Sequence, residues 1–331
     1  MSFDKKNVKF LVNFSIIIVI LFTNLTGCGA QKVPLTEQNF LLDTVITLTY
    51  YDEADRDAVL EALALCRDYE AVFSRTLPDS ELSRLNAADT LEVSDALRTV
   101  LETGLSYCEA SGGRFDITLG GVSALYDFSG KPRLPAPAEL SDALAHVGWA
   151  HVHLDGNTVS IDDPETVIDL GAIAKGFIAD EMKALLQSRG VKHAIISLGG
   201  NVLTLGGKPD GSPFTVGIQY PEKDSSRLVS AVTVSDASVV TSGVYERFFV
   251  ENGQTYHHLL DPEDGAPLRN GLLAVSVVGP CSMDCDALST VCFALGLEEG
   301  LALMEATDGY EALFITEDQA LHPSSGFDAL K

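Results

Sequence analysis

Residues 167–200, VIDLGAIAKGFIADEMKALLQSRGVKHAIISLGG, decide which kind of fold this chain can adopt. The short run 167–170 predicts a strand that ends at the turn of Gly171. Apolar residues at helical spacing from about residue 174 to 189, closed by a glycine, predict a helix. A second strand is expected over 193–198, before a pair of glycines. A helix between two strands with short connections indicates a domain that mixes α and β structure.

The rest of the chain continues this mixture. Upstream we expect one strand over 40–51, amphipathic helices over 54–73 and 94–111, and a hairpin over 152–161. Downstream we expect strands over 214–219, 229–234, 238–241, 248–250 and 274–278, and then two helices after Asp284 and Leu297. The predicted fold class is α+β, with mixed, largely antiparallel strands and packed helices. No linker interrupts it, so residues 40–331 should form a single catalytic unit of one or two lobes.

The N-terminus has the order of an export signal. Lysines precede an apolar run of about 13 residues, whereas a membrane-spanning helix needs roughly 20. The following LTGC (25–28) resembles a bacterial lipoprotein cleavage site. We therefore expect residues 1–27 to be a signal peptide, Cys28 to be the lipidated first residue, and 28–39 to be a polar tether. Acyl chains would hold the protein on the extracytoplasmic face of the cell membrane. The alternative is an uncleaved signal anchor with an incidental cysteine.

The net charge limits the possible ligands. It is −25 for the whole chain, and the chain after the signal keeps 19 basic and 46 acidic residues, a net charge of −27. A field of this sign repels polyanions, which argues against nucleic acid as a partner. An anionic dinucleotide could bind if a divalent cation came with it.

The cysteines do not predict a disulfide framework. Five remain besides Cys28, an odd number without a repeated CxxC pair. Cys281 and Cys285 could be two metal ligands. Because no histidine or further cysteine completes a zinc set, buried small apolar residues are the favoured interpretation.

The segment DLGAIAKG (169–176) combines features of a phosphate site. A carboxylate, Gly171 and Lys175 precede a helix within seven positions. The glycine lets the backbone approach a ligand, the helix start presents amide groups to negative charge, and Lys175 can add a point charge to a diphosphate. The alternative is an ordinary glycine turn followed by a solvated lysine.

Asp286 and Thr290 are candidates for one cation site. They lie four residues apart in DALST (286–290), on one face of the expected helix. Carboxylate and hydroxyl oxygens suit Mg²⁺, which fills its remaining positions with water and substrate phosphate. The alternative has Asp284 as the N-cap of the helix and Thr290 buried.

A third cluster, TSGVYER (241–247) and YHHLLDP (256–262), brings several polar side chains to neighbouring strands and turns. His258 is a candidate general base or phosphate contact, because imidazole changes its charge near neutral pH. The alternative is a structural histidine beside a turn. The chain has no GxxxxGK[ST], GxSxG or HExxH sequence, which argues against common nucleotide-binding and protease classes.

Taken in order, these segments together with GGN (199–201) resemble the motifs of the FAD:protein FMN transferases, the ApbE family. The resemblance extends through LDTV (42–45), DSELSRLN (79–86) and GGRFDIT (112–118), and so covers nearly all of the chain after the signal. It implies Mg²⁺-dependent transfer of FMN from FAD to a threonine hydroxyl, with release of AMP. It also implies acceptor flavoproteins among the subunits of membrane redox complexes.

The resemblance further implies roles for single residues. Mg²⁺ would be held by Asp286, Thr290 and the main-chain carbonyl of Ala172, and His258 and Lys175 would be the catalytic side chains. Contacts with FAD would come from Leu42, Thr76, Asp116, Ile117, Thr118, Asp169, Lys175, Ser242 and Leu260. The sequence departs from the family at Leu42-Asp43, where many members have Met-Gly, and at Thr76, where some have tyrosine.

Two other functions stay open at this point. An FAD pyrophosphatase would use the same metal and diphosphate site with water in place of threonine, and would give free FMN and AMP. A non-catalytic, lipid-anchored flavin-binding protein would hold FAD without breaking a bond.

Overall fold

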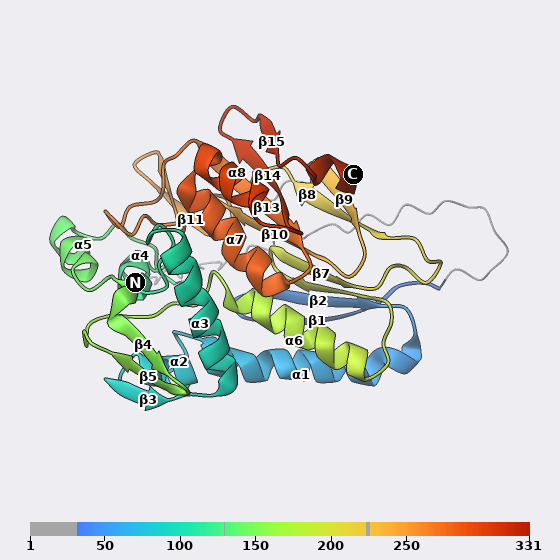
Figure 1. Cartoon of the computed structure of the whole chain (residues 1–331), viewed down its shortest axis with the longest axis horizontal. Helices are drawn as coiled ribbons and strands as arrows, with labels where there is room; N and C mark the ends of the chain where they lie inside the picture. Colours follow the sequence, from blue (N-terminus) through green and yellow to red (C-terminus); the bar gives the residue numbers. More distant parts are fainter. Residues whose placement is uncertain (1–31, 129, 223–225) are drawn as a thin grey trace, which may run out of the picture.

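The computed structural model describes residues 32–128, 130–222 and 226–331. The expected signal peptide and Cys28 lie outside these residues. Within the described ranges, no helix is long and apolar enough to cross a membrane. The chain has the predicted α+β fold, with an eight-stranded antiparallel sheet, three smaller sheets and packed helices (Figure 1).

The central sheet has the order β1-β2-β6-β7-β10-β13-β14-β15, and all neighbouring strands are antiparallel. Its strands are β1 (Leu35–Leu41), β2 (Thr44–Tyr50), β6 (Ala194–Leu198), β7 (Asn201–Leu205), β10 (Ser238–Gly243), β13 (Leu272–Gly279), β14 (Glu311–Thr316) and β15 (Leu321–Pro323). The smaller sheets pair β3 (Thr90–Glu92) and β4 (Val152–Asp155) with β5 (Thr158–Ile161), β8 (Phe214–Gln219) with β9 (Leu228–Val234), and β11 (Phe248–Glu251) with β12 (Gln254–His257).

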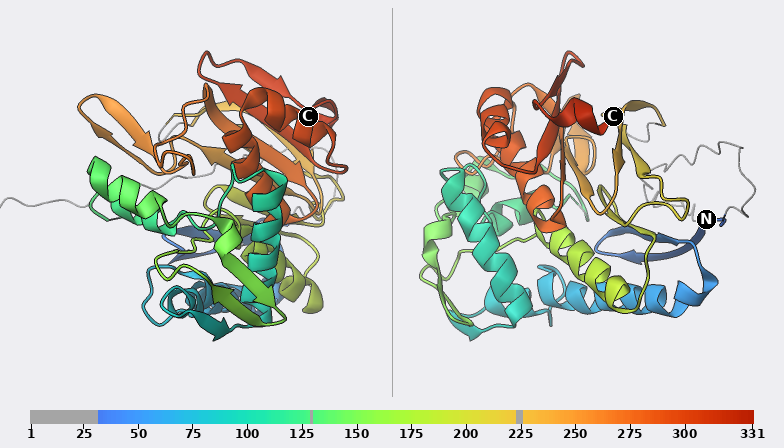
Figure 2. Two further views of the ribbon diagram at one scale, coloured as in Figure 1. Left: turned by 60° about the vertical axis from the view of Figure 1, so that its left-hand side comes forward. Right: turned by 45° about the vertical axis from the view of Figure 1, so that its right-hand side comes forward.

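The helices divide between the central sheet and a smaller flanking region. Figures 1 and 2 show α1 and α6 beside the β1–β6 part of the sheet, and α7 and α8 beside β13 and β14. The helices are α1 (Arg56–Phe73), α2 (Glu81–Leu85), α3 (Asp95–Ala110), α4 (Gly120–Tyr126), α5 (Pro137–Leu144), α6 (Ala174–Ser188), α7 (Ser282–Leu295) and α8 (Leu297–Glu305), with 3-10 turns η1 (Glu53–Asp55), η2 (Trp149–His151) and η3 (Phe327–Leu330).

Alternation along the strands divides the core into two layers. On β14, Ala312 and Phe314 pack with residues of α7 and α8. Leu313 and Ile315 point to the opposite face, where they pack with residues of β8, β9 and η3. Because successive side chains of a strand point to opposite faces, a strand covered on both sides is apolar at every position. This explains why β14 has no alternating signal and is absent from the predicted strands.

The expected strand over 40–51 is two strands. Leu42 and Asp43 join β1 to β2, and both have positive φ values, +55° and +57°. Such a type I′ turn is usually formed by Asn-Gly or Asp-Gly, so the sequence Leu-Asp does not predict it. The fold therefore begins at Leu35, inside the region that was expected to be tether.

Residues 167–170 do not form the predicted strand. Val167 makes only an isolated parallel bridge with Leu119. The next residue, Ile168, is held by the side chain of Asn86, which accepts from its N–H at 2.8 Å and donates to its carbonyl at 2.9 Å. A side-chain amide thus takes the place of a neighbouring strand, which strand propensity alone does not anticipate.

Most of the other predicted elements are confirmed. Helices α1, α3 and α6, the β4–β5 hairpin, and strands β6, β8, β9, β10, β11 and β13 match the expected ranges closely, and α7 begins two residues before Asp284. The elements β3, β7, β12, β15, α2 and α4 were not predicted. Cys66, Cys108, Cys285 and Cys292 are buried free thiols, and Cys281 is partly exposed. The described cysteines therefore form no disulfide.

Candidate active site

Helices α6 and α7 approach closely at Gly176. Its N–H donates to Oδ2 of Asp286 at 2.9 Å. A Cβ atom at position 176 would collide with main-chain atoms of Ser282 and Met283 at the start of α7. Only glycine fits this contact without a shift of backbone, so Gly176 brings the N-terminus of α6 beside the Asp286 carboxylate.

A carboxylate of α6 also caps α7. Asp180 Oδ1 accepts from the N–H of Ser282 at 3.0 Å, and Oδ2 accepts from the N–H of Met283 at 2.9 Å. Burial raises the pKa of Asp180, which these bonds partly oppose. Asp180 thereby fixes the start of α7 relative to α6.

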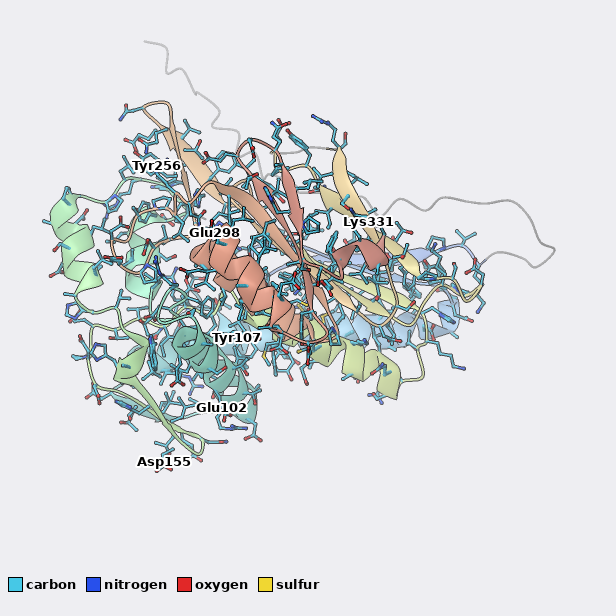
Figure 3. The ribbon with its side chains drawn as sticks, turned by 45° about the horizontal axis from the view of Figure 1, so that its top comes forward. Glu102, Tyr107, Asp155, Tyr256, Glu298 and Lys331 are labelled. Atoms are coloured by element: carbon cyan, nitrogen blue, oxygen red, sulfur yellow. The ribbon has the colours of Figure 1, made fainter. Side chains whose placement is uncertain are left out.

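The N-cap role considered for Asp284 is wrong. Cys281 occupies the N-cap position of α7, and Asp284 lies in the first turn. Its carboxylate accepts from Tyr107 Oη at 2.9 Å and from Tyr310 Oη at 2.7 Å. Figure 3 marks Tyr107 on α3, beside α7. Asp284 therefore ties α7 to its neighbours and has no part in the proposed cation site.

Lys175 lies between a main-chain carbonyl and a buried carboxylate. Its Nζ donates to the carbonyl of Gly171 at 2.8 Å and is 3.6 Å from Oδ1 of Asp286. The Asp286 side chain is only 5% exposed. One carboxylate oxygen thus accepts from Gly176, and the other faces a positive charge. The alternative of a freely solvated lysine is wrong.

Hydroxyl groups continue this polar strip along α7. Thr290 Oγ1 is 3.0 Å from Ser242 Oγ of β10, which is also 2.8 Å from Ser289 Oγ. Thr290 is half-buried. Asp286 and Thr290 are on one helix, one turn apart, as predicted, and the structure brings Ser242 to the same place.

The donors fit a hard cation. No group of three or more His, Cys, Asp and Glu side chains suited to a metal occurs in the described part of the chain. The available donors are the Asp286 carboxylate, the Thr290 hydroxyl, and the loop before α6, where the carbonyl of Gly171 precedes that of Ala172. The Lys175 ammonium lies near two of these oxygens, the carbonyl of Gly171 and Oδ1 of Asp286. Few protein oxygens with room for phosphate and water suit Mg²⁺.

Asp169 is engaged with its own chain. Its Oδ1 accepts from the N–H of Gly171 at 2.9 Å, and its Oδ2 accepts from Arg75 Nε at 3.0 Å. The sequence did not single out Arg75, which places a guanidinium beside the exposed Thr76. Asp169 therefore shapes the turn before α6 and positions a cationic side chain next to it.

The segment 116–118 lies directly beside this turn, since the N–H of Asp169 donates to the carbonyl of Ile117 at 2.7 Å. Asp116 Oδ1 accepts from the N–H of Thr118 at 2.8 Å and from its hydroxyl at 2.6 Å. Ile117 and Thr118 are 2% and 1% exposed. Both residues are interior as a whole, main chain included, so in this structure neither presents a surface to a ligand.

Two other expected flavin contacts lie at the edges of hydrophobic clusters. The N–H of Leu42 donates to Glu70 Oε1 of α1 at 2.7 Å, which holds the strained turn in place. Leu260 is buried against Val122 and Tyr126, in a cluster that includes residues of the β11–β12 hairpin. Figure 3 marks Tyr256 on this hairpin, which projects from the body of the molecule.

The surroundings of His258 favour its neutral imidazole form. Burial lowers its pKa to about 3, and the positive charges of Arg247 and Lys175 act in the same direction. Its Nδ1 atom is buried and has no hydrogen-bond partner among the described residues. The structure thus places His258 within electrostatic reach of Lys175, with a nitrogen left to accept or donate.

Glu246 was not singled out as a functional residue, although it lies within TSGVYER. Its Oε1 lies over Gly200, only 2.8 Å from where a Cβ atom would stand. Burial raises its pKa to about 7, opposed by Lys175 and Arg247 and reinforced by Asp286. Its side chain is nevertheless accessible to solvent. Glu246 therefore lies within electrostatic reach of both Lys175 and Asp286, at a position that solvent can enter.

Known proteins are similar to this chain in both sequence and fold. A model of the ApbE family matches residues 42–314. An FAD:protein FMN transferase of Treponema pallidum is 35% identical, over 94% of this chain and 92% of its own, and one of Klebsiella pneumoniae is 33% identical, over 85% and 88%. The ApbE protein of Thermotoga maritima superposes with a TM-score of 0.83 at 28% identity, over 90% of this chain and 99% of its own. The flavin transferase ApbE of Vibrio cholerae gives 0.81 at 28% identity, over the same shares.

Proposed function

The chain belongs to the ApbE family, and from this membership we propose that it is an FAD:protein FMN transferase that depends on Mg²⁺. It transfers FMN to a threonine hydroxyl of an acceptor protein and releases AMP. The observation that carries this proposal is the cluster of Asp286, Lys175 and Thr290. A carboxylate beside a lysine and the start of a helix suits the binding of a diphosphate together with a metal ion.

In the proposed reaction the threonine oxygen attacks the phosphorus of the FMN half of FAD. The new phosphoester bond forms as the bond to the AMP phosphate breaks, AMP keeps the bridging oxygen, and the hydroxyl proton is lost. Mg²⁺, held by Asp286, Thr290 and the carbonyl of Ala172, would supply neutralisation of charge on the diphosphate. Positioning and charge compensation then account for most of the rate enhancement.

Residues of the chain do the rest. Lys175 binds the diphosphate oxygens beside the start of α6. His258 accepts the threonine proton or donates to a phosphoryl oxygen. Its pKa of about 3 belongs to the protein without ligand. Since nearby negative charge raises the pKa of an imidazole, a bound diphosphate makes His258 a better proton acceptor.

The flavin nucleotide would lie against the segments that surround this cluster. In this proposal Leu42, Thr76, Asp116, Ser242 and Leu260 contribute side-chain contacts, and Ile117 and Thr118 belong to the segment that lines the flavin. Asp169 acts through the turn at Gly171 and through its ion pair with Arg75, whose guanidinium adds a positive charge beside that turn.

The location and the partners are part of the same proposal. The signal sequence and LTGC (25–28) support lipidation at Cys28 and attachment to the extracytoplasmic face of the cell membrane. Such an anchor suits acceptors that are flavin-carrying subunits of membrane redox complexes. The net charge of −25 supports the absence of nucleic acid among the partners.

Mass spectrometry tests the proposal directly. The protein is incubated with FAD, MgCl₂ and the acceptor domain of a membrane redox subunit, and the intact acceptor is weighed. The proposal expects the covalent addition of FMN at one threonine, and its loss after Thr→Val substitution in the acceptor. Free FMN and AMP with an unmodified acceptor would instead establish a pyrophosphatase, and intact FAD would establish a binding protein.

A further inference from the structure

The Lys175 ammonium occupies a position that a metal ion would also suit. It donates to the carbonyl of Gly171 at 2.8 Å and lies 3.6 Å from Asp286 Oδ1. The proposed metal site uses the same kinds of oxygen. It shares the Asp286 carboxylate with Lys175, and it uses the main-chain carbonyl of Ala172, the residue next to Gly171. Lysine and metal therefore compete for one carboxylate oxygen.

Asp286 needs a cation at all times. Its side chain is 5% exposed, and Gly176 supplies only a neutral N–H to Oδ2. A buried carboxylate without a compensating charge is strongly disfavoured. In the protein without ligand, Lys175 is the cationic side chain that forms an ion pair with Asp286 among the described residues.

Lys175 can leave this position when another cation replaces it on Asp286. Its side chain is 27% exposed, and its hydrogen bond is to Gly171, an exposed residue of the loop before α6. A diphosphate at the start of α6 offers the ammonium a doubly charged partner in exchange. A divalent ion on Asp286 with the ammonium still 3.6 Å away would be repelled, because like charges at this distance oppose each other strongly.

We propose that the Lys175 ammonium pairs with Asp286 while no substrate is bound. When substrate binds, the ammonium moves onto the diphosphate and the metal ion takes its place on the Asp286 carboxylate. The inference rests on the proposed function, because it needs the metal site at Asp286. It implies that metal and dinucleotide each tighten the binding of the other, since binding free energies are coupled reciprocally. The metal-loaded protein without nucleotide would then be sparsely populated.

The test measures metal affinity in the absence of turnover. Mn²⁺ binding to the full mature chain is titrated by the EPR signal of the free ion, alone and with ADP as a diphosphate that carries no flavin, after correction for the Mn²⁺–ADP complex in solution. In the wild type, ADP should tighten Mn²⁺ binding at least 10-fold. In Lys175→Met, Mn²⁺ should bind at least 10-fold more tightly than to wild type when no nucleotide is present, and ADP should add much less.

Lys183→Met is the matched control. Lys183 lies on the same helix, two turns after Lys175, is 14% exposed and pairs with Asp236. Its loss should leave both Mn²⁺ affinities unchanged. The wild-type titrations do not depend on how well the Lys175→Met variant folds. If ADP leaves the Mn²⁺ affinity of the wild type unchanged, the exchange is overturned whatever the variant does.

The outcomes separate this inference from the proposed function. One outcome is that Asp286→Asn abolishes Mn²⁺ binding, whereas Lys175→Met, without nucleotide, binds Mn²⁺ no more tightly than wild type does. The metal site is then supported, and the exchange by Lys175 is overturned. If Asp286→Asn binds Mn²⁺ as well as wild type does, with and without ADP, the metal site itself is absent and both proposals fail.

Discussion

The main-chain N–H of Gly176 donates to Oδ2 of Asp286 at 2.9 Å, across 110 residues of sequence. This bond joins the first turn of α6 to the second turn of α7, and it fixes the carboxylate with its other oxygen towards Lys175. The site therefore depends on the close approach of two helices, and not only on the side chains that line it.

Substitution of Gly176 by alanine should separate the helices. The new Cβ atom would collide with main-chain atoms of Ser282 and Met283, which cannot rotate away. We expect a loss of about 1–3 kcal/mol in the free energy of unfolding and a weaker metal-dependent activity. Urea denaturation and Mn²⁺ titration measure the two effects. Gly121→Ala is the control, because its Cβ would meet only Val167 Cγ2 at 3.9 Å, and it should leave both unchanged or add stability.

Asp180→Ala should loosen the start of α7. Two N–H groups lose their acceptor, which costs about 1–3 kcal/mol of stability. Amide hydrogen exchange at Ser282 and Met283 should accelerate before the rest of α7 is affected. Asp55→Ala is the comparison, since Asp55 precedes α1 without a side-chain capping bond. Equal destabilisation by the two changes would contradict the capping role of Asp180.

Removal of the Thr290 hydroxyl should weaken metal binding without unfolding the protein. Thr290→Val keeps the shape of the side chain, and we expect about a 10-fold loss of Mn²⁺ affinity, whereas Thr290→Ser should keep most of it. Isothermal titration provides the measurement. Thr241→Val removes a neighbouring hydroxyl that bonds to Ser276 at 2.7 Å and should have no such effect. Wild-type affinity in the valine variant would remove Thr290 from the ligand set.

Glu246 should make stability depend on pH. Its pKa rises from an ordinary value of 4.5 to about 7 on folding, so the stability it provides is complete below pH 4.5 and is lost as the pH rises through 7. Because the side chain is accessible to solvent, we expect a difference of about 1 kcal/mol or less. Urea unfolding at pH 5 and pH 8 should show a smaller decline in Glu246→Gln than in wild type. The exposed Glu251 provides the control, and its glutamine variant should follow wild type.

The turn between β1 and β2 offers a stabilising change. Asp43 has a φ of +57°, a conformation that glycine adopts without strain. Asp43→Gly should raise the free energy of unfolding by up to about 1 kcal/mol, because aspartate tolerates this conformation better than most residues. Thermal unfolding checks the prediction. A lower melting temperature would mean that the Asp43 side chain stabilises the turn in another way.

Predictions from the sequence were most accurate where the spacing of residues along one helix is enough to determine the structure. Asp286 and Thr290 lie on one face of α7 because their spacing matches the helical repeat, and this needed no tertiary information. The same holds for Lys175 at the start of α6, in the first turn after the glycine. Both halves of the candidate site could therefore be named from the sequence.

What brings the halves together could not be read in this way. The cap of α7 comes from Asp180 on another helix, so the local interpretation chose Asp284 instead. The segment 167–170 has the composition of a strand, but Asn86 satisfies its backbone. In each case a polar side chain distant in sequence supplies the bond, and neither propensity nor spacing encodes that partner.

The start of the fold at Leu35 also sets how far the enzyme can reach. If Cys28 carries the lipid, only six residues separate it from β1, and at about 3.5 Å per residue an extended chain of that length spans little more than 20 Å. The body of the molecule would then stay close to the bilayer surface. An acceptor threonine high on a long ectodomain could not be modified, so the anchor would select substrates by their height above the membrane.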